Sequence, residues 1–148
     1  MAEESEFISR TGTIEATADR VYAFATDVRN FNRFVPGSVL KNWSASNEEC
    51  SFEMTPIGHA SVKIVDKEPC SLIRFEGSAF NETSFRLWFQ MKEPEPGTTR
   101  FRIVIRADLN PLYKMMAAGP LNEFLEKLVT GVEKFRDWDD VVTDIQSP

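Results

Sequence analysis

Residues 85–107 read FRLWFQMKEPEPGTTRFRIVIRA and contain one of the clearest patterns in the chain. Apolar side chains alternate with mostly polar ones on either side of Pro94-Glu95-Pro96-Gly97, and this period of two predicts two half-buried strands joined by a turn. Folding the hairpin about that turn gathers an apolar set on one face: Phe85, Leu87, Phe89, Phe101, Ile103 and Ile105. The other face carries Arg86, Trp88 and Arg102, and a register error of one residue would exchange the two faces.

The same alternation continues through residues 39–108, which turn clusters divide into six predicted strands. The connections between them are short, which favours an antiparallel meander because parallel strands need long crossovers. Upstream, the segment Glu6 to Glu15 is rich in β-branched and aromatic residues and predicts one further strand. The expected sheet is therefore antiparallel, with one apolar face and one polar, solvent-exposed face, called the wet face below.

Helices are predicted at both ends of this sheet region. Thr17 is a suitable N-cap for a short amphipathic helix, and a second short helix ends at Pro36-Gly37. Near the carboxy terminus, Asn110-Pro111 predicts the start of a long helix. Its apolar stripe, which we expect to pack on the sheet, includes Leu121, Phe124, Leu125, Leu128 and Val132. Leu112, Met115 and Met116 fall on the opposite side of that helix, so we expect a break or kink at Gly119-Pro120.

The composition limits the classes of function. The chain has 148 residues, the size of one domain, and its 17 Lys and Arg against 23 Asp and Glu give a net charge of −6. This charge repels phosphate backbones, so we expect no nucleic acid partner. The acidic start and the longest apolar run, Val21 to Ala25, predict a cytoplasmic protein with no membrane span. Cys50 and Cys70 are expected to be reduced thiols.

Motifs for nucleotide, metal or nucleophilic chemistry do not occur in the sequence, so we assign no catalytic residue and expect no cofactor and no metal. His59 is the one histidine and lies beside a turn glycine, which predicts a position at the rim or surface. Glu53, Arg74 and Glu76 are expected to be solvated or paired charges on the wet face.

The order of elements, together with Asp27-Val28-Arg29-Asn30-Phe31-Asn32-Arg33-Phe34-Val35-Pro36 at the end of the first helical pair, resembles the START-like polyketide cyclase/dehydrase and lipid-transport superfamily. The likeness covers the chain from about Phe7 to about Trp138. It implies an α+β helix-grip fold, in which a curved antiparallel seven-stranded sheet wraps around the long C-terminal helix and two short helices follow the first strand. Residues 1–148 would form a single START-like domain with a structured core over about 7–138.

The resemblance also implies a cavity between sheet and helix. We therefore expect a binding protein for a small hydrophobic or aromatic ligand or a lipid, acting as carrier, sensor or sequestering protein. Met115 and Met116 are expected to form an adaptable lid over the mouth of the cavity. The candidate ligand-binding residues, for which ordinary core packing is the alternative, are Phe31, Phe34, Met54, Phe85, Phe89, Ile103, Ile105, Met115, Met116 and Phe124.

Two other functions stay open. The first is an enzyme of the cyclase or hydratase kind that uses the same cavity, with His59 or a buried carboxylate moving a proton. The second is a protein-interaction module, chaperone-related or homodimeric, that works through the wet face around Trp88. On that face we expect Trp88 opposite or beside Arg102 and Val104, within reach of cation–π stacking. A binding protein is favoured over an enzyme.

Overall fold

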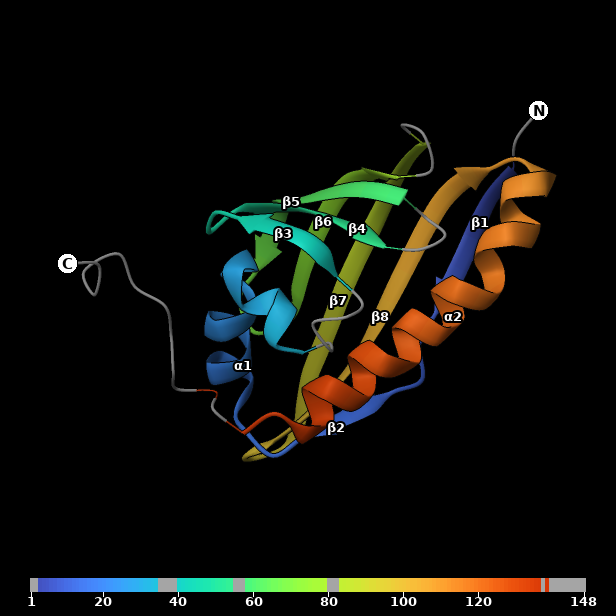
Figure 1. Cartoon of the computed structure of the whole chain (residues 1–148). Helices are drawn as coiled ribbons and strands as arrows, with labels where there is room; N and C mark the ends of the chain where they lie inside the picture. Colours follow the sequence, from blue (N-terminus) through green and yellow to red (C-terminus); the bar gives the residue numbers. More distant parts are fainter. Residues whose placement is uncertain (1–2, 35–39, 55–57, 80–82, 137, 139–148) are drawn as a thin grey trace.

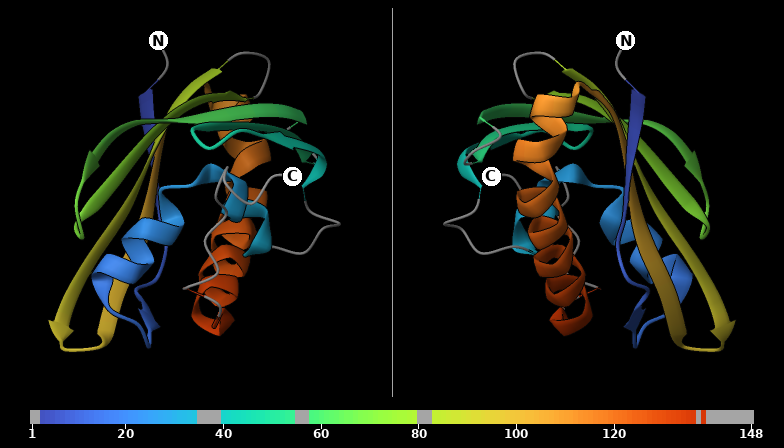
Figure 2. Two further views of the ribbon diagram at one scale, coloured as in Figure 1. Left: turned by 90° about the vertical axis from the view of Figure 1, so that its left-hand side faces the viewer. Right: turned by 90° about the vertical axis from the view of Figure 1, so that its right-hand side faces the viewer.

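The computed structural model describes residues 3–34, 40–54, 58–79, 83–136 and 138. A curved antiparallel sheet covers one side of a long helix, and two short helices lie at one end of that sheet (Figures 1 and 2). The strands are β1 (Glu3–Ile8), β2 (Gly12–Ile14), β3 (Lys41–Ala45), β4 (Glu49–Met54), β5 (Gly58–Glu68), β6 (Leu72–Ala79), β7 (Thr83–Glu95) and β8 (Thr98–Leu109). The helices are α1 (Ala18–Ala25), the 3-10 helix η1 (Val28–Arg33) and α2 (Pro111–Lys134). The predicted α+β helix-grip fold is confirmed.

The strands lie in the order β1-β8-β7-β6-β5-β4-β3, and β2 also pairs with β8. In the β7–β8 hairpin, Leu87 is paired with Ile105 and Phe89 with Ile103. These four side chains are buried, whereas Arg102 on the opposite face is exposed. The predicted register of the hairpin is therefore correct, and its apolar face is the concave face of the sheet.

The predicted first strand is divided in two by residues 9–11. Ile8 is paired with Val104 and Gly12 with Phe101, so three residues on one side face two on β8. The Ser9 amide donates to the Ile103 carbonyl at 2.9 Å, and Ser9 Oγ accepts from the Ile103 amide at 2.9 Å. Such a bulge satisfies the backbone while turning side chains in new directions. The sheet consequently has eight strands where seven were predicted.

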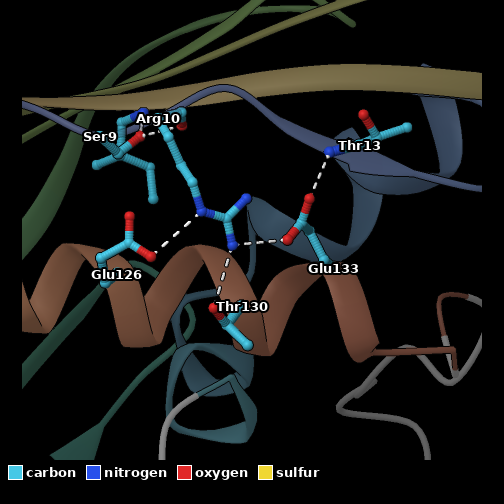
Figure 3. Close-up of polar contacts among 7 residues, drawn as sticks. Ser9, Arg10, Thr13, Glu126, Thr130 and Glu133 are labelled. Atoms are coloured by element: carbon cyan, nitrogen blue, oxygen red, sulfur yellow. Dashed lines mark hydrogen bonds and ion pairs between the residues drawn. The ribbon is translucent and has the colours of Figure 1, made fainter.

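Arg10, within this bulge, connects the sheet to the C-terminal half of α2 (Figure 3). Its Nε donates to Glu126 Oε2 at 3.2 Å, and its Nη2 donates to Glu133 Oε1 at 2.8 Å and to Thr130 Oγ1 at 3.1 Å. Glu133 Oε2 also accepts from the Thr13 amide at 3.1 Å. The hydrogen bond from Arg10, reinforced by that amide, lowers the pKa of Glu133. These contacts fix the position of α2 along the concave face.

Helix α2 runs from Pro111 to Lys134 with Pro120 inside it. Its N-cap is Asn110, as predicted, and Asn110 Oδ1 accepts from the Tyr113 amide at 2.9 Å. Figure 1 shows its first turns running at an angle to the remainder. Because proline has no amide hydrogen, it removes one hydrogen bond from the helix and permits this bend. The helix is therefore bent but not broken.

Helix α1 begins at the predicted N-cap residue, but its capping hydrogen bond comes from a different side chain. Thr17 is the N-cap residue, but its side chain makes no capping hydrogen bond. Instead, Glu93 Oε1 of β7 accepts from the Ala18 amide at 2.7 Å, and Glu93 Oε2 accepts from the Gly97 amide at 2.9 Å. The two amides lower the pKa of Glu93. A carboxylate from another strand thus replaces the local hydroxyl at this positive end of the helix.

Candidate functional site: an apolar cavity

A cavity of about 100 Å³ lies between the concave face of the sheet, η1 and α2. Its lining is apolar apart from one carboxylate and one thiol, and six of its residues are phenylalanines. The lining residues are Ala25, Asp27, Val28, Phe31, Phe34, Cys50, Phe52, Met54, Ala60, Val62, Phe75, Ala79, Phe85, Leu87, Ile105, Ala107, Leu121 and Phe124.

Aromatic rings form one wall of the cavity. Phe31 of η1 is stacked at 6.0 Å between ring centroids on Trp43 of β3 and at 6.4 Å on Phe52 of β4. The ring of Phe124 from α2 lies 6.3 Å from that of Phe31. Rings at these separations prefer offset or tilted arrangements, which gives the wall a defined shape. Three of these rings, those of Phe31, Phe52 and Phe124, line the cavity.

The space exists because small residues occupy inward positions of the sheet. Ala60 of β5, Ala79 of β6 and Ala107 of β8 are buried and line the cavity. Gly77 of β6 faces the same way, and a Cβ there would overlap the carbonyl oxygen of Ser61 and contact the Phe85 ring. These small inward residues leave space between this part of the sheet, the rings of the wall and α2.

Two polar groups belong to the lining. Asp27 is the N-cap of η1, and its carboxylate accepts from the amide of Arg29 at 3.0 Å and from Nε and Nη2 of the same residue at 2.9 and 2.7 Å. Cys50 is 5% exposed. Burial, with a smaller effect of the Glu49 charge, raises the pKa of the Cys50 thiol to about 12. At neutral pH this thiol is protonated and is a poor nucleophile.

His59 is exposed on β5 and is paired with Glu53 of β4, whose carboxylate accepts from Asn42 Nδ2 at 2.5 Å. Its neighbour Ala60 points into the cavity, so the histidine points away from it. The predicted surface position is correct. Among the described lining residues, Asp27 and Cys50 are thus the titratable groups that face the cavity.

The structure brings together six of the ten candidate ligand-binding residues. The six that line the cavity are Phe31, Phe34, Met54, Phe85, Ile105 and Phe124. Phe89 and Ile103 are buried further along the hairpin, where the Phe89 ring is stacked on that of Phe101 at 5.4 Å. Met115 and Met116 are 81% and 50% exposed and do not line the cavity, so the predicted lid is wrong. The bend in α2 leaves both methionines on the solvent side of its first turns.

Several lining residues were not predicted. Phe52, Val62 and Phe75 follow the period of two on β4, β5 and β6, which predicts their inward position but does not distinguish cavity-lining residues from ordinary core. The inward alanines carry no such signal, because alternation does not tell a small residue in a packed core from one that leaves a void.

Trp88 lies on the convex face, where it is half-buried and paired with Val104, as predicted. Its cation–π partner is Arg106, with the guanidinium carbon 5.4 Å from the ring centroid. Arg102 instead donates its Nε to Gln90 Oε1 at 2.6 Å. The expected stacking partner is therefore corrected from Arg102 to Arg106.

No protein-family model and no curated protein matches the sequence. Solved structures do match over nearly the whole chain. A conserved protein from Geobacillus kaustophilus has a TM-score of 0.66 at 10% identity, covering 89% of this chain and 93% of its own. A START superfamily protein from Mycobacterium smegmatis has a TM-score of 0.58 at 14% identity, with coverages of 87% and 97%. The chain has the helix-grip fold of START-like proteins.

An enzyme shares this START-like fold. Norcoclaurine synthase from Thalictrum flavum, in complex with dopamine and hydroxybenzaldehyde, matches with a TM-score of 0.64 at 9% identity, covering 91% of this chain and 90% of its own. At such identities the likeness concerns the fold and not the activity. Across the described residues, no helix is long and apolar enough to cross a membrane, and no group of three or more acidic, His or Cys residues could hold a metal ion.

Proposed function

We propose that this START-like protein binds a small aromatic molecule in the cavity between its sheet and α2. The observation that carries the proposal is the lining, in which six phenylalanines surround a space with one buried thiol and one carboxylate already held by Arg29. An apolar void of this kind gains dispersion contacts and loses no solvated polar groups when an apolar ligand fills it.

The volume favours a molecule with one ring. A drug-sized pocket measures roughly 300–1,000 Å³, whereas an engineered apolar cavity of about 150 Å³ binds benzene. The cavity here is about 100 Å³. Binding of a fatty acid, a flavonoid or a quinone would therefore require α2 or η1 to move away from the sheet. Norcoclaurine synthase, which has the same fold, is complexed with two molecules that each carry a single aromatic ring.

Binding is a better proposal than catalysis by these residues. Acid–base catalysis needs a group with a suitable pKa within hydrogen-bond reach of the substrate. Among the described lining residues, the carboxylate of Asp27 is engaged by Arg29 and the thiol of Cys50 stays protonated. A carrier, sensor or sequestering role needs neither group.

Native mass spectrometry of the purified protein, followed by thermal-shift screening, tests this proposal. Toluene, phenol and hydroxybenzaldehyde are the one-ring probes, and palmitate and a flavonoid are the larger ones. We expect the one-ring probes to raise the melting temperature, since ligand at a hundred times its dissociation constant stabilises a protein by about 2.7 kcal/mol. If only the larger probes raise the melting temperature, the proposed ligand becomes a lipid or a polycyclic molecule. No shift and no co-purified molecule would overturn the binding function.

A further inference from the structure

A second hollow, of about 420 Å³, lies on the outer side of the β7–β8 hairpin. Its lining residues are Thr11, Gln90, Met91, Lys92, Arg100, Phe101 and Arg102. Met91 and Phe101 have side chains that are 6% and 2% exposed in the core, so the groups that face solvent are mainly polar and cationic. The lining includes three cationic side chains and no carboxylate, in a protein whose net charge is −6.

Two of the three cations lie directly opposite one another. Lys92 of β7 is paired with Arg100 of β8, and like charges in such a position destabilise a sheet. Within the described part of the chain, neither side chain has a hydrogen bond or an ion pair. The carboxylate of Glu93, the next residue on β7, accepts from the amides of Ala18 and Gly97, so it does not neutralise the charges of Lys92 and Arg100.

A comparable pair further along the hairpin is compensated by carboxylates. Arg86 and Arg106 are also directly opposite one another. There, Arg106 Nε donates to Glu6 Oε2 at 2.6 Å, and Glu76 of β6 lies directly opposite Arg86 in the sheet. The contrast indicates that the Lys92–Arg100 pair lacks a counter-charge that the sheet supplies elsewhere.

The third cation is held in a defined orientation. Gln90 Oε1 accepts from Arg102 Nε at 2.6 Å, which positions the guanidinium and leaves its terminal nitrogens for a ligand. Thr11 enters the lining because the bulge at residues 9–11 separates β1 from β2 opposite Arg102. A planar guanidinium pair, an ammonium and a hydroxyl are donors suited to the several oxygens of a dianion.

From this geometry we infer that the hollow binds a phosphate monoester group. The net negative charge of the chain does not prevent this, because at physiological salt a charge further than about 8 Å from the site is largely screened. The site lies on the convex side of the sheet, opposite the apolar cavity, and does not depend on what that cavity binds. The phosphate could belong to a soluble molecule or to a lipid headgroup, and the two sources are distinguished by experiment.

Titration with inorganic phosphate, followed by amide chemical shifts in NMR, tests the site. Sodium chloride at matched ionic strength is the control for screening. We expect saturable shifts at residues 11, 92, 100 and 102 with phosphate and not with chloride. Arg100→Gln should weaken the apparent affinity by about tenfold or more, the loss of one charge-assisted contact. Arg86→Gln, on the same face but outside the hollow, should leave it unchanged.

Two further arms complete the test. Without phosphate, Arg100→Gln should melt at a higher temperature than the parent, because it removes the like-charge repulsion with Lys92. Glycerol 3-phosphate and phosphatidylcholine vesicles containing phosphatidic acid then identify the source. If glycerol 3-phosphate binds to the parent and not to Arg100→Gln, the phosphate site is supported and its ligand is a soluble molecule. If the vesicles bind to the parent and not to Arg100→Gln, the site is supported and its ligand is a lipid headgroup. Unsaturable shifts equal to those with chloride, or affinity that is unaffected by Arg100→Gln, would overturn the inference.

Discussion

Gly131 of α2 lies against the backbone of Phe34 so closely that a Cβ on Gly131 would overlap the carbonyl oxygen of Phe34. This contact brings the last turn of α2 onto the end of η1. It also adjoins an aromatic cluster in which the Phe34 ring packs edge-on against Phe135 at 5.3 Å and lies tilted against Trp138 at 5.7 Å between ring centroids. The close approach therefore helps to define the end of the cavity at which Phe34 lies.

The first prediction uses two glycines of the same helix. In an open helix interior, Gly→Ala stabilises by about 1 kcal/mol. Gly119 has open space around its Cβ position, so Gly119→Ala should stay within about 1 kcal/mol of the parent, the gain being reduced by the following proline. Gly131→Ala should destabilise by more than 1 kcal/mol, roughly, because α2 must move away from Phe34. Urea unfolding of both variants measures this difference, and equal stabilities would show that the contact is not tight.

The second prediction concerns acid stability. The pKa of Glu93 is lowered from its ordinary value of 4.5 by the amides of Ala18 and Gly97. The charged form is thus favoured by folding, so its stabilisation is present above pH 4.5 and is lost as the pH falls through the lower folded value. Glu93→Gln should destabilise the protein at pH 7, and the difference from the parent should shrink at pH 3. Glu95→Gln is the control, and a difference independent of pH would contradict the capping role.

The fold was predictable where one face of an element is buried over many residues. Alternation in the β7–β8 hairpin identified the inward side chains correctly, because the concave face excludes water along its length. The cap of α1 was not predictable in this way. Glu93 and Ala18 are 75 positions apart in the sequence, and no local pattern contains a contact over that separation.

The site was predictable only in part, for a related reason. The phenylalanines of the cavity are apolar in any arrangement, and six of the ten candidates do line it. The apolar residues before Pro120 do lie on a different side of the helix from those after it, but Met115 and Met116 face solvent and not the cavity. The direction of a bend depends on what packs against the helix, and in α2 the contacts of Arg10 with Glu126 and Glu133 hold the half that follows the proline.

The third prediction concerns the two thiols, which are both free. Cys70 is exposed in the turn between β5 and β6, whereas Cys50 is buried in the cavity wall with a pKa raised to about 12. Because the thiolate is the reactive form, a disulfide reagent at pH 7.5 should label Cys70 at least about a hundred times faster than Cys50. Mass spectrometry of Cys50→Ser and Cys70→Ser measures each rate alone. Labelling of Cys50 at a comparable rate would mean that the cavity opens readily to solvent.

The fourth prediction is that filling the cavity abolishes binding without unfolding the protein. Ala60 is 3% exposed and is paired with Phe52 of the aromatic wall. Ala60→Leu would place a larger side chain in the void, and a cavity that accepts it should keep the unfolding free energy within about 1.5 kcal/mol of the parent. The thermal shift caused by toluene or phenol should then disappear.

Ala23→Leu is the matched control, because Ala23 is exposed on α1 and does not line the cavity. It makes the same chemical change and should leave the thermal shift intact. Retention of the full shift in Ala60→Leu would mean that the aromatic probe binds elsewhere. Severe destabilisation by Ala60→Leu alone would mean that the wall cannot move by the width of a side chain; Ala107→Val, a smaller filling on β8, would then reduce the affinity if the cavity is the site.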